Sequence, residues 1–245
     1  EASDPRSLKH MTARTKVVLT TVGPYQLYGS ALVAACAESG TDYVDLCGEP
    51  GWMLAMIETH ETTAKKTGAR VVFSCGFDSI PFDLGVFFLQ GEANERFGGS
   101  CIEVKARVRK MKGTLSGGTV ASLKATMAAC RDPSMAKLLN SPFALTPGFE
   151  GPQQPSDSEP RLDQSIGAWV APFIMAPINT KNIHRSNLLL GHAYGTDFRY
   201  SEMLVAGPGE RGEKIATAIA SDNVLIGDDI AKPGEGPTAQ EREAG

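Results

Sequence analysis

The sequence lacks the features that would assign it to a specialised class of protein. No apolar run approaches the roughly 20 residues that cross a bilayer. There is no basic excess either, since 24 Lys and Arg stand against 28 Asp and Glu, a net charge of −4. The five cysteines are scattered and form no Cys-x-x-Cys pair. We therefore set aside a membrane-spanning protein, a nucleic-acid-binding surface and a disulfide framework. We expect a reduced, cytoplasmic protein, and peripheral membrane association stays open.

Signatures of metal sites and of activated nucleophiles are also missing from the sequence. The four histidines show no metal-ligand spacing, and neither H-E-x-x-H nor G-x-S-x-G occurs. We accordingly expect no metal. The composition is that of an ordinary globular protein, with 42% hydrophobic and 21% charged residues. A chain of 245 residues is long enough for one large or two modest domains.

The first part of the chain alternates short apolar runs with helical patterns. Strands are predicted at 16–22, 42–47 and 70–75, and helices at 29–39 and 50–67. Such alternation is typical of βαβ units, which form a parallel sheet with right-handed crossovers, so both helices should cover one face. The β-branched first run predicts a strand buried on both faces.

The pattern changes after a helix expected at 82–97. Apolar residues alternate over 101–108, which predicts a half-buried strand of an antiparallel sheet. Prolines and glycines over 146–167 predict a long, irregular and mobile loop, and the chain ends in a polar tail. The fold class is therefore α/β: a partial Rossmann-type parallel sheet over 1–98, followed by a second α+β domain over 99–245 that binds substrate or partners.

A first candidate site follows the first predicted strand. Thr21, Val22, Gly23, Pro24 and Tyr25 lie at its carboxyl end, where open α/β sheets bind their ligands. A Gly-Pro turn lets a flat ligand approach the backbone closely. The alternative is an ordinary strand-to-helix turn.

A second candidate site follows the third predicted strand. Asp78, Ser79 and Asp83 lie in the segment that begins at Gly76 and ends at Gly85 and that also contains a proline. Clustered carboxylates can orient a substrate or move a proton. The alternative is a helix capped by Asp78 or Ser79, and both roles can coexist. Between the two sites, Glu49 could supply negative charge to the next helical turn.

Two further stretches carry weaker signals. Residues 207–212 match G-x-G-x-x-G, but no parallel strand is expected after them, so we do not assign a dinucleotide site there. Residues 185–187, Arg-Ser-Asn, could line a pocket or form a solvated turn.

Residues 15–88 resemble the saccharopine dehydrogenase-like oxidoreductases, in particular their trans-acting enoyl reductases. The resemblance rests on T-T-V-G-P-Y at 20–25, Y-V-D-L-C-G-E at 43–49 and C-G-F-D-S-I-P-F-D-L-G at 75–85. Shorter similar motifs are M-A-P-I at 175–178, R-S-N at 185–187, D-F-R-Y at 197–200 and K-P-G-E-G-P at 232–237.

The resemblance implies hydride transfer from NADP(H) or NAD(H) to a double bond, as in enoyl reduction during lipid or glycolipid synthesis. It places Asp4 near the adenine, the 21–25 turn and Gly76 to Ser79 at the cofactor, and Asp78 in the active site. It also implies that the family's Gly-rich phosphate-binding turn would precede Glu1. The alternatives are a saccharopine-type imine reductase and a non-catalytic, lipid-associated scaffold. A small-molecule or lipid substrate is expected, and a homodimer is compatible with the resemblance.

Overall fold

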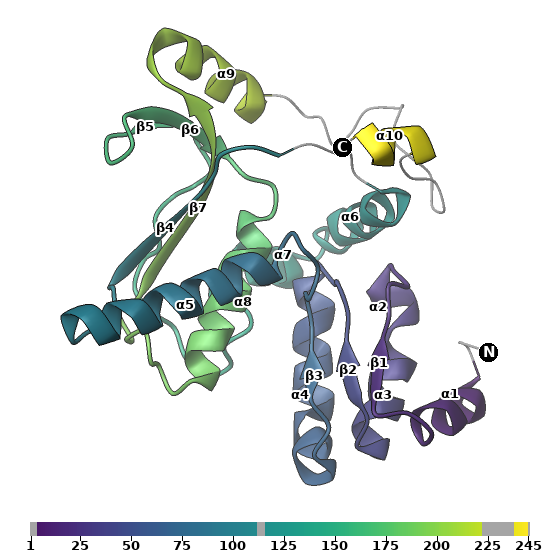
Figure 1. Ribbon diagram of the computed structural model, residues 1–245. Helices are drawn as coiled ribbons and strands as arrows, with labels where there is room; N and C mark the ends of the chain where they lie inside the picture. The colour runs from purple at the N-terminus through teal and green to yellow at the C-terminus, as the bar shows by residue number, and fades with distance from the viewer. Residues whose placement is uncertain (1–3, 112–115, 222–237, 245) are drawn as a thin grey trace. The chain divides into compact units, whose positions relative to one another are not determined.

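The computed structural model describes residues 4–111, 116–221 and 238–244 (Figure 1). The described chain forms two compact units: unit 1 comprises 4–80 and 116–144, and unit 2 comprises 81–111, 145–221 and 238–244. The sequence places a boundary near 98, whereas the units divide at 80. The difference arises because the helix that spans the predicted boundary contributes Val86 to the core of unit 2. The K-P-G-E-G-P motif at 232–237 lies outside the described residues.

Unit 1 is built around a three-stranded parallel sheet. Its elements are α1 (Pro5–Thr12), β1 (Val17–Leu19), α2 (Tyr25–Tyr28), α3 (Ser30–Ser39), β2 (Asp42–Val44), α4 (Pro50–Thr67), β3 (Val71–Val72), α6 (Gly117–Ala129) and α7 (Pro133–Asn140). The strand order is β1-β2-β3, and both pairs are parallel, which confirms the predicted direction. Helices α3 and α4 pack against each other, and Figure 1 shows both behind the strands.

The strands of unit 1 have one covered and one open face. Val71 points to the covered face, where it packs with Ala37 of α3 and Ala64 of α4. Val17 and Leu19 alternate to the other face and are 49% and 73% exposed. The prediction that the first strand is buried on both faces is therefore wrong for the described residues, because α3 and α4 cover only one face.

Unit 2 contains a mixed four-stranded sheet. Its elements are α5 (Ile80–Phe97), β4 (Glu103–Val108), β5 (Arg161–Asp163), β6 (Ala168–Pro172), α8 (Ala176–Leu189), β7 (Arg199–Gly207), α9 (Gly209–Ser221) and α10 (Ala239–Ala244). The strand order is β4-β7-β6-β5. The strand predicted over 101–108 is confirmed as β4, but it pairs with β7 in parallel, so its predicted antiparallel direction is wrong. Alternating apolar residues reveal one buried face, but they carry no information on the direction of the neighbouring strand.

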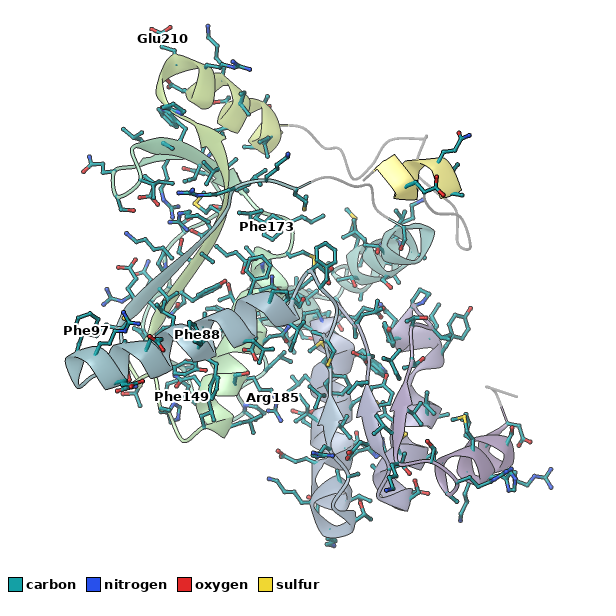
Figure 2. All side chains as sticks on the ribbon, viewed as in Figure 1. Phe88, Phe97, Phe149, Phe173, Arg185 and Glu210 are labelled. Carbon is teal, nitrogen blue, oxygen red and sulfur yellow. The ribbon has the colours of Figure 1, made fainter. Side chains whose placement is uncertain are left out.

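The core of unit 2 joins α5 and α8 to one face of this sheet. Its buried members are Val86, Val104, Ile183, Tyr194, Phe198 and Tyr200. The opposite side of α5 is apolar and open, with Leu84 and Phe88 56% and 68% exposed, and Phe97 at the end of the helix is 82% exposed; Phe88 and Phe97 are labelled in Figure 2. The helix predicted over 82–97 is confirmed as α5. Its buried residues are Val86, Gln90 and Ala93, while most of its phenylalanines are exposed.

The segment over 146–167 is irregular over most of its length, as its composition predicts, but it is also anchored to the sheet of unit 2. It contains β5, and it is hydrogen-bonded to β7 on both sides of Ser156. The Tyr200 amide donates to Gln154 Oε1 at 3.0 Å, and the Ser201 hydroxyl donates to Asp157 Oδ1 at 2.8 Å. Arg161 also bonds Asp157 at 2.8 Å. Proline and glycine content alone could not predict these polar contacts.

The G-x-G-x-x-G match at 207–212 joins β7 to α9. A Cβ on Gly212 would lie 1.9 Å from the Gly207 carbonyl oxygen, so glycine allows the helix to lie against the end of its strand. Close packing therefore explains the last glycine of this match, and the described residues place no strand after α9. No helix in the described ranges is long and apolar enough to cross a membrane.

Candidate functional site

The loops that follow β1, β2 and β3 are tied together at the carboxyl edge of the unit 1 sheet. Strand β2 lies in the middle of the sheet, and its loop carries two buried carboxyl groups, Asp45 and Glu49, which are 3% and 2% exposed. One reaches the loop after β1 and the other reaches the loop after β3. The two sites that the sequence suggests are thus connected through the loop between them.

Glu49 holds the turn that follows β1. Its Oε1 accepts the Tyr25 amide at 2.8 Å, and its Oε2 accepts the Gln26 amide and the Gln26 side-chain amide, both at 2.9 Å. Helix α2 begins at Tyr25 after Pro24, which provides no side-chain cap. Glu49 therefore satisfies the first free amides of α2 from a distant point in the sequence. Glu49 is also the N-cap residue of α4, where its charge was predicted to act on the first turn, although its side chain makes no capping hydrogen bond there.

Tyr25 closes the same turn from inside. It is 3% exposed, and its hydroxyl donates to the Thr20 carbonyl at 3.2 Å and accepts the Leu46 amide at 3.4 Å. Burial raises the pKa of this phenol above its ordinary value. Its ring lies 5.5 Å from that of Trp52. Tyr25 therefore supports the turn, while Thr21 and Val22 are the exposed residues of it.

Asp45 joins the loops after β2 and β3. Its Oδ1 accepts the amides of Cys47 and Ser74, each at 2.9 Å, and its Oδ2 accepts the Tyr43 hydroxyl at 2.8 Å. Burial raises the pKa of the Asp45 carboxyl to about 6, although its hydrogen bonds act in the opposite direction. A buried carboxyl group with three donors fixes the positions of both loops.

The backbone of Ser74 is strained at this junction. Its φ is 58°, in the left-handed region that residues other than glycine seldom adopt. The Ser74 hydroxyl donates to the Cys47 carbonyl at 2.6 Å, and Asp45 holds its amide. Strain that the surroundings hold in place is common at functional sites. Cys47 is 1% exposed, and burial raises the pKa of its thiol, so it is a packing residue.

Gly76, Asp78 and Ser79 form the turn between β3 and α5. The amides of Ser79 and Ile80 donate to the Gly76 carbonyl at 3.0 and 2.9 Å. A Cβ on Gly76 would lie 2.6 Å from Asp78 Oδ1, so the Asp78 carboxyl group lies directly over this glycine. Asp78 is half-buried and Ser79 is buried. The Asp78 carboxyl group therefore belongs to the candidate site, while Ser79 shapes the turn.

Two other predicted or nearby residues complete the description of unit 1. Asp4, which the resemblance places near the adenine, caps α1, since its carboxylate accepts the Arg6 amide at 3.0 Å. Helix α6 reaches the turn after β1, because a Cβ on Gly23 would lie 3.4 Å from Ser122 Oγ. Residues far apart in sequence thus contribute to the surroundings of this turn.

The Arg-Ser-Asn motif at 185–187 lies on α8, not in a solvated turn. The Ser186 hydroxyl donates to Asp83 Oδ2 at 3.0 Å inside unit 2, and Arg185 donates to the Leu145 carbonyl at 3.0 Å. Burial raises the pKa of the Asp83 carboxyl. Asp83 thus binds α5 to α8 and differs in its surroundings from Asp78. Across the described ranges, no three His, Cys, Asp or Glu side chains are grouped so that they could hold a metal ion.

Some residues of the candidate site could be predicted from the sequence, and others could not. Except for Asp4, which caps α1, the residues expected to contact a cofactor lie in loops at one sheet edge, after β1 and β3. The reasoning from sequence missed Asp45, and it missed the contacts of Glu49 with the turn after β1. A signal was available for Asp45, because an ionisable residue at the end of an apolar strand must find partners when it is buried.

Comparison with known proteins finds similar proteins that carry the same name. No protein-family model matches the chain. A Mycobacterium tuberculosis protein with the provisional name of trans-acting enoyl reductase is 43% identical over 270 residues, covering all of this chain and 64% of that protein. Trans-acting enoyl reductases of Mycobacterium ulcerans and Mycobacterium bovis are 38% and 37% identical, again over all of this chain and 65% of theirs. The chain thus spans slightly less than two thirds of the length of these relatives.

Proposed function

We propose that the carboxyl edge of β1, β2 and β3 receives the nicotinamide half of NADP(H) or NAD(H), and that the complete protein reduces an enoyl double bond of a lipid or glycolipid precursor. The observation that carries this proposal is the arrangement of the loops at this edge. Asp45 and Glu49, from the loop after β2, hold the loops after β3 and β1, which contain the two candidate sites. The names of the relatives support enoyl reduction as the reaction.

The residues at this edge fit a nicotinamide ring and its carboxamide. Thr21 and Val22 are exposed beside the half-buried Gly23, so a flat ring could lie against the turn without displacing a side chain. The Asp78 carboxyl group over Gly76 could accept the amide N–H of a carboxamide or hold a proton. The bound nicotinamide would supply the hydride, while these residues orient the ring and exclude water.

The proposal leaves the pyrophosphate half to other parts of the protein. The G-x-G-x-x-G match at 207–212 is explained by the packing of α9 on β7. The open apolar face of β1 and the coverage of the relatives both support a complete protein with a further layer on this sheet. This 245-residue chain is then expected to bind NADPH at least about 100-fold more weakly than the complete protein.

The test uses the complete protein, with whatever sequence flanks these residues in its gene. Purified protein is mixed with NADPH or NADH and with an α,β-unsaturated thioester, and the loss of absorbance at the nicotinamide band is followed. Saturable, protein-dependent oxidation supports the proposal. Turnover only with an imine formed from two amino acids would favour the saccharopine-type reaction. Binding of neither cofactor would favour the lipid-associated scaffold.

The proposed reaction also suggests what the protein could interact with. A lipid chain is an apolar substrate, and the open side chains of α5, including Phe88 and Phe97, are compatible with peripheral membrane association or a homodimer. Flotation with vesicles and light scattering of the complete protein would measure these two properties separately.

A further inference from the structure

Glu49 is placed to control the turn that the proposed function assigns to the cofactor. It comes from the loop after β2, yet it accepts three hydrogen bonds from Tyr25 and Gln26, at the beginning of α2. The residue is 2% exposed, so it cannot itself contact a ligand at the surface. Its influence must therefore pass through the two residues that it holds.

The alternatives for holding this turn are weak. Pro24 provides no side-chain cap for α2, and the hydroxyl of Tyr25 points away to Thr20 and Leu46. The Tyr25 and Gln26 amides belong to the first turn of a helix, where backbone donors need a partner from outside the helix. The described contacts of these two amides are both to Glu49.

We propose that Glu49 is a positioning residue, whose carboxylate fixes the turn over 20–26 in the shape that receives the nicotinamide. This inference rests on the proposed function. It assigns to the Y-V-D-L-C-G-E motif a role at the neighbouring strand, and it separates two duties within one loop: Asp45 fixes the turn after β3, and Glu49 fixes the turn after β1. Neither residue needs to touch the ligand.

Replacement of Glu49 by glutamine separates this role from simple packing. Glutamine has nearly the same volume, but it offers one acceptor oxygen and one donor NH₂ group. At least one of the backbone amides of Tyr25 and Gln26 would then face a donor. The fold should survive because the size of the side chain is kept, while the turn should lose its fixed shape.

The experiment compares Glu49→Gln with the same substitution at Glu58, an exposed residue on α4. In the complete protein, Glu49→Gln should raise the KM for NADPH about tenfold or more, with kcat changed less than about threefold. Amide hydrogen exchange of the peptide over 20–26 should accelerate about tenfold or more, while other peptides stay unchanged. Glu58→Gln should resemble the wild type in both measurements.

A milder variant protects the test against loss of folding. Gln26→Met removes one donor to Glu49 and keeps both backbone bonds, so it should raise the KM for NADPH by about two- to threefold. Faster exchange at 20–26 with an unchanged KM would show that Glu49 only stabilises the fold. Unchanged exchange would refute the positioning role altogether. If the wild type oxidises no nicotinamide cofactor, the proposed function fails, and the local exchange result still decides whether Glu49 holds the turn.

Discussion

The same hydrogen bond, from a tyrosine to an acid two residues later, occurs at β2 of unit 1 and in β7 of unit 2, and its structural role differs between them. In unit 1 the Tyr43 hydroxyl donates to Asp45 at 2.8 Å, and in unit 2 the Tyr200 hydroxyl donates to Glu202 at 2.6 Å. Both acids lie two residues beyond the tyrosine, and burial raises the pKa of both carboxyl groups, to about 6 and about 7. The local pattern is therefore shared, and what differs is the position of the acid along its strand.

Asp45 lies at the end of its strand, where the polypeptide turns, and it accepts the backbone amides of two loops. Glu202 lies inside β7, where its own amide donates to Asp157 Oδ2 at 2.8 Å, and its other acceptor atom receives the side chain of Asn179 on α8 at 2.8 Å. A buried acid thus organises loops at a strand end and joins a helix to a sheet in a strand interior. The comparison predicts that changes in unit 1 alter function and changes in unit 2 alter stability.

The largest effect is expected for Asp78→Asn, at the edge that Asp45 organises. The substitution keeps shape and most of the capping ability of the residue, so the melting temperature should change little. If Asp78 orients the carboxamide or relays a proton, kcat should fall by a factor of about 10² to 10⁴. Asp78→Ala serves as the control: a purely structural cap would lose about 1 kcal/mol of stability while turnover is kept. Full turnover in Asp78→Asn would remove Asp78 from the reaction.

Glu202→Ala should instead affect the stability of unit 2. It leaves the Tyr200 hydroxyl and the Asn179 amide without this acceptor inside the core, which should cost about 3 kcal/mol in the free energy of unfolding. Urea denaturation measures this loss, and Glu213→Ala on the exposed side of α9 is the matched control. A loss as small as that of the control would mean that the buried pair adds nothing to stability.

Asp45 should give unit 1 a characteristic dependence on pH. Folding raises the pKa of Asp45 from an ordinary 3.8 to about 6, mainly by burial, so the folded state holds this proton more tightly than the unfolded state. The resulting stabilisation is complete below about pH 4 and is lost as the pH rises through about 6. Relative to Asp45→Asn, the wild type should therefore lose about 1–3 kcal/mol between pH 4 and pH 7. Thermal melting of both proteins at intervals across this range gives the difference, and a constant difference would contradict the assigned shift.

The smallest effect concerns the outer faces of the two sheets. Unit 1 exposes Leu19 there, whereas β4 of unit 2 exposes Glu103 and Lys105. In the 245-residue chain, both Leu19→Ser and Lys105→Ser should change stability by less than about 0.5 kcal/mol. In the complete protein, a further layer over β1 would make Leu19→Ser cost about 1–2 kcal/mol, since a leucine would then be buried. Equal results in the two proteins would show that the face of β1 stays open.

The sequence allowed much of unit 1 to be predicted, because its signals are local. The short apolar runs of β1, β2 and β3 end at turns that contain glycine or proline, and their alternation with helical patterns predicts a parallel sheet with its loops on one edge. The Asp45 and Glu49 contacts could not be derived in the same way. The bonds from these two acids to the neighbouring loops join residues 23 to 29 positions apart, and their geometry depends on the register of the strands.

Unit 2 was harder to predict because its polar residues are buried. Helix α8 presents Asn179, His184 and Asn187 to the interior, so its apolar periodicity is weak, and the sequence analysis predicted no helix there. Burial lowers the pKa of His184 to about 4, which keeps its ring neutral inside the unit. The direction of β4 and the extra strand β5 were likewise set by contacts between distant residues.

Hydrogen exchange of the complete protein with and without NADPH tests the central claim most directly. If the carboxyl edge of unit 1 binds the nicotinamide, saturating NADPH should slow exchange in the peptides over 20–26 and 74–79, which contain the turn held by Glu49 and the turn held by Asp45. The peptide over 207–212 should exchange at the same rate in both conditions. Protection at 207–212 without protection at 20–26 and 74–79, or no protection in any of them, would contradict the account.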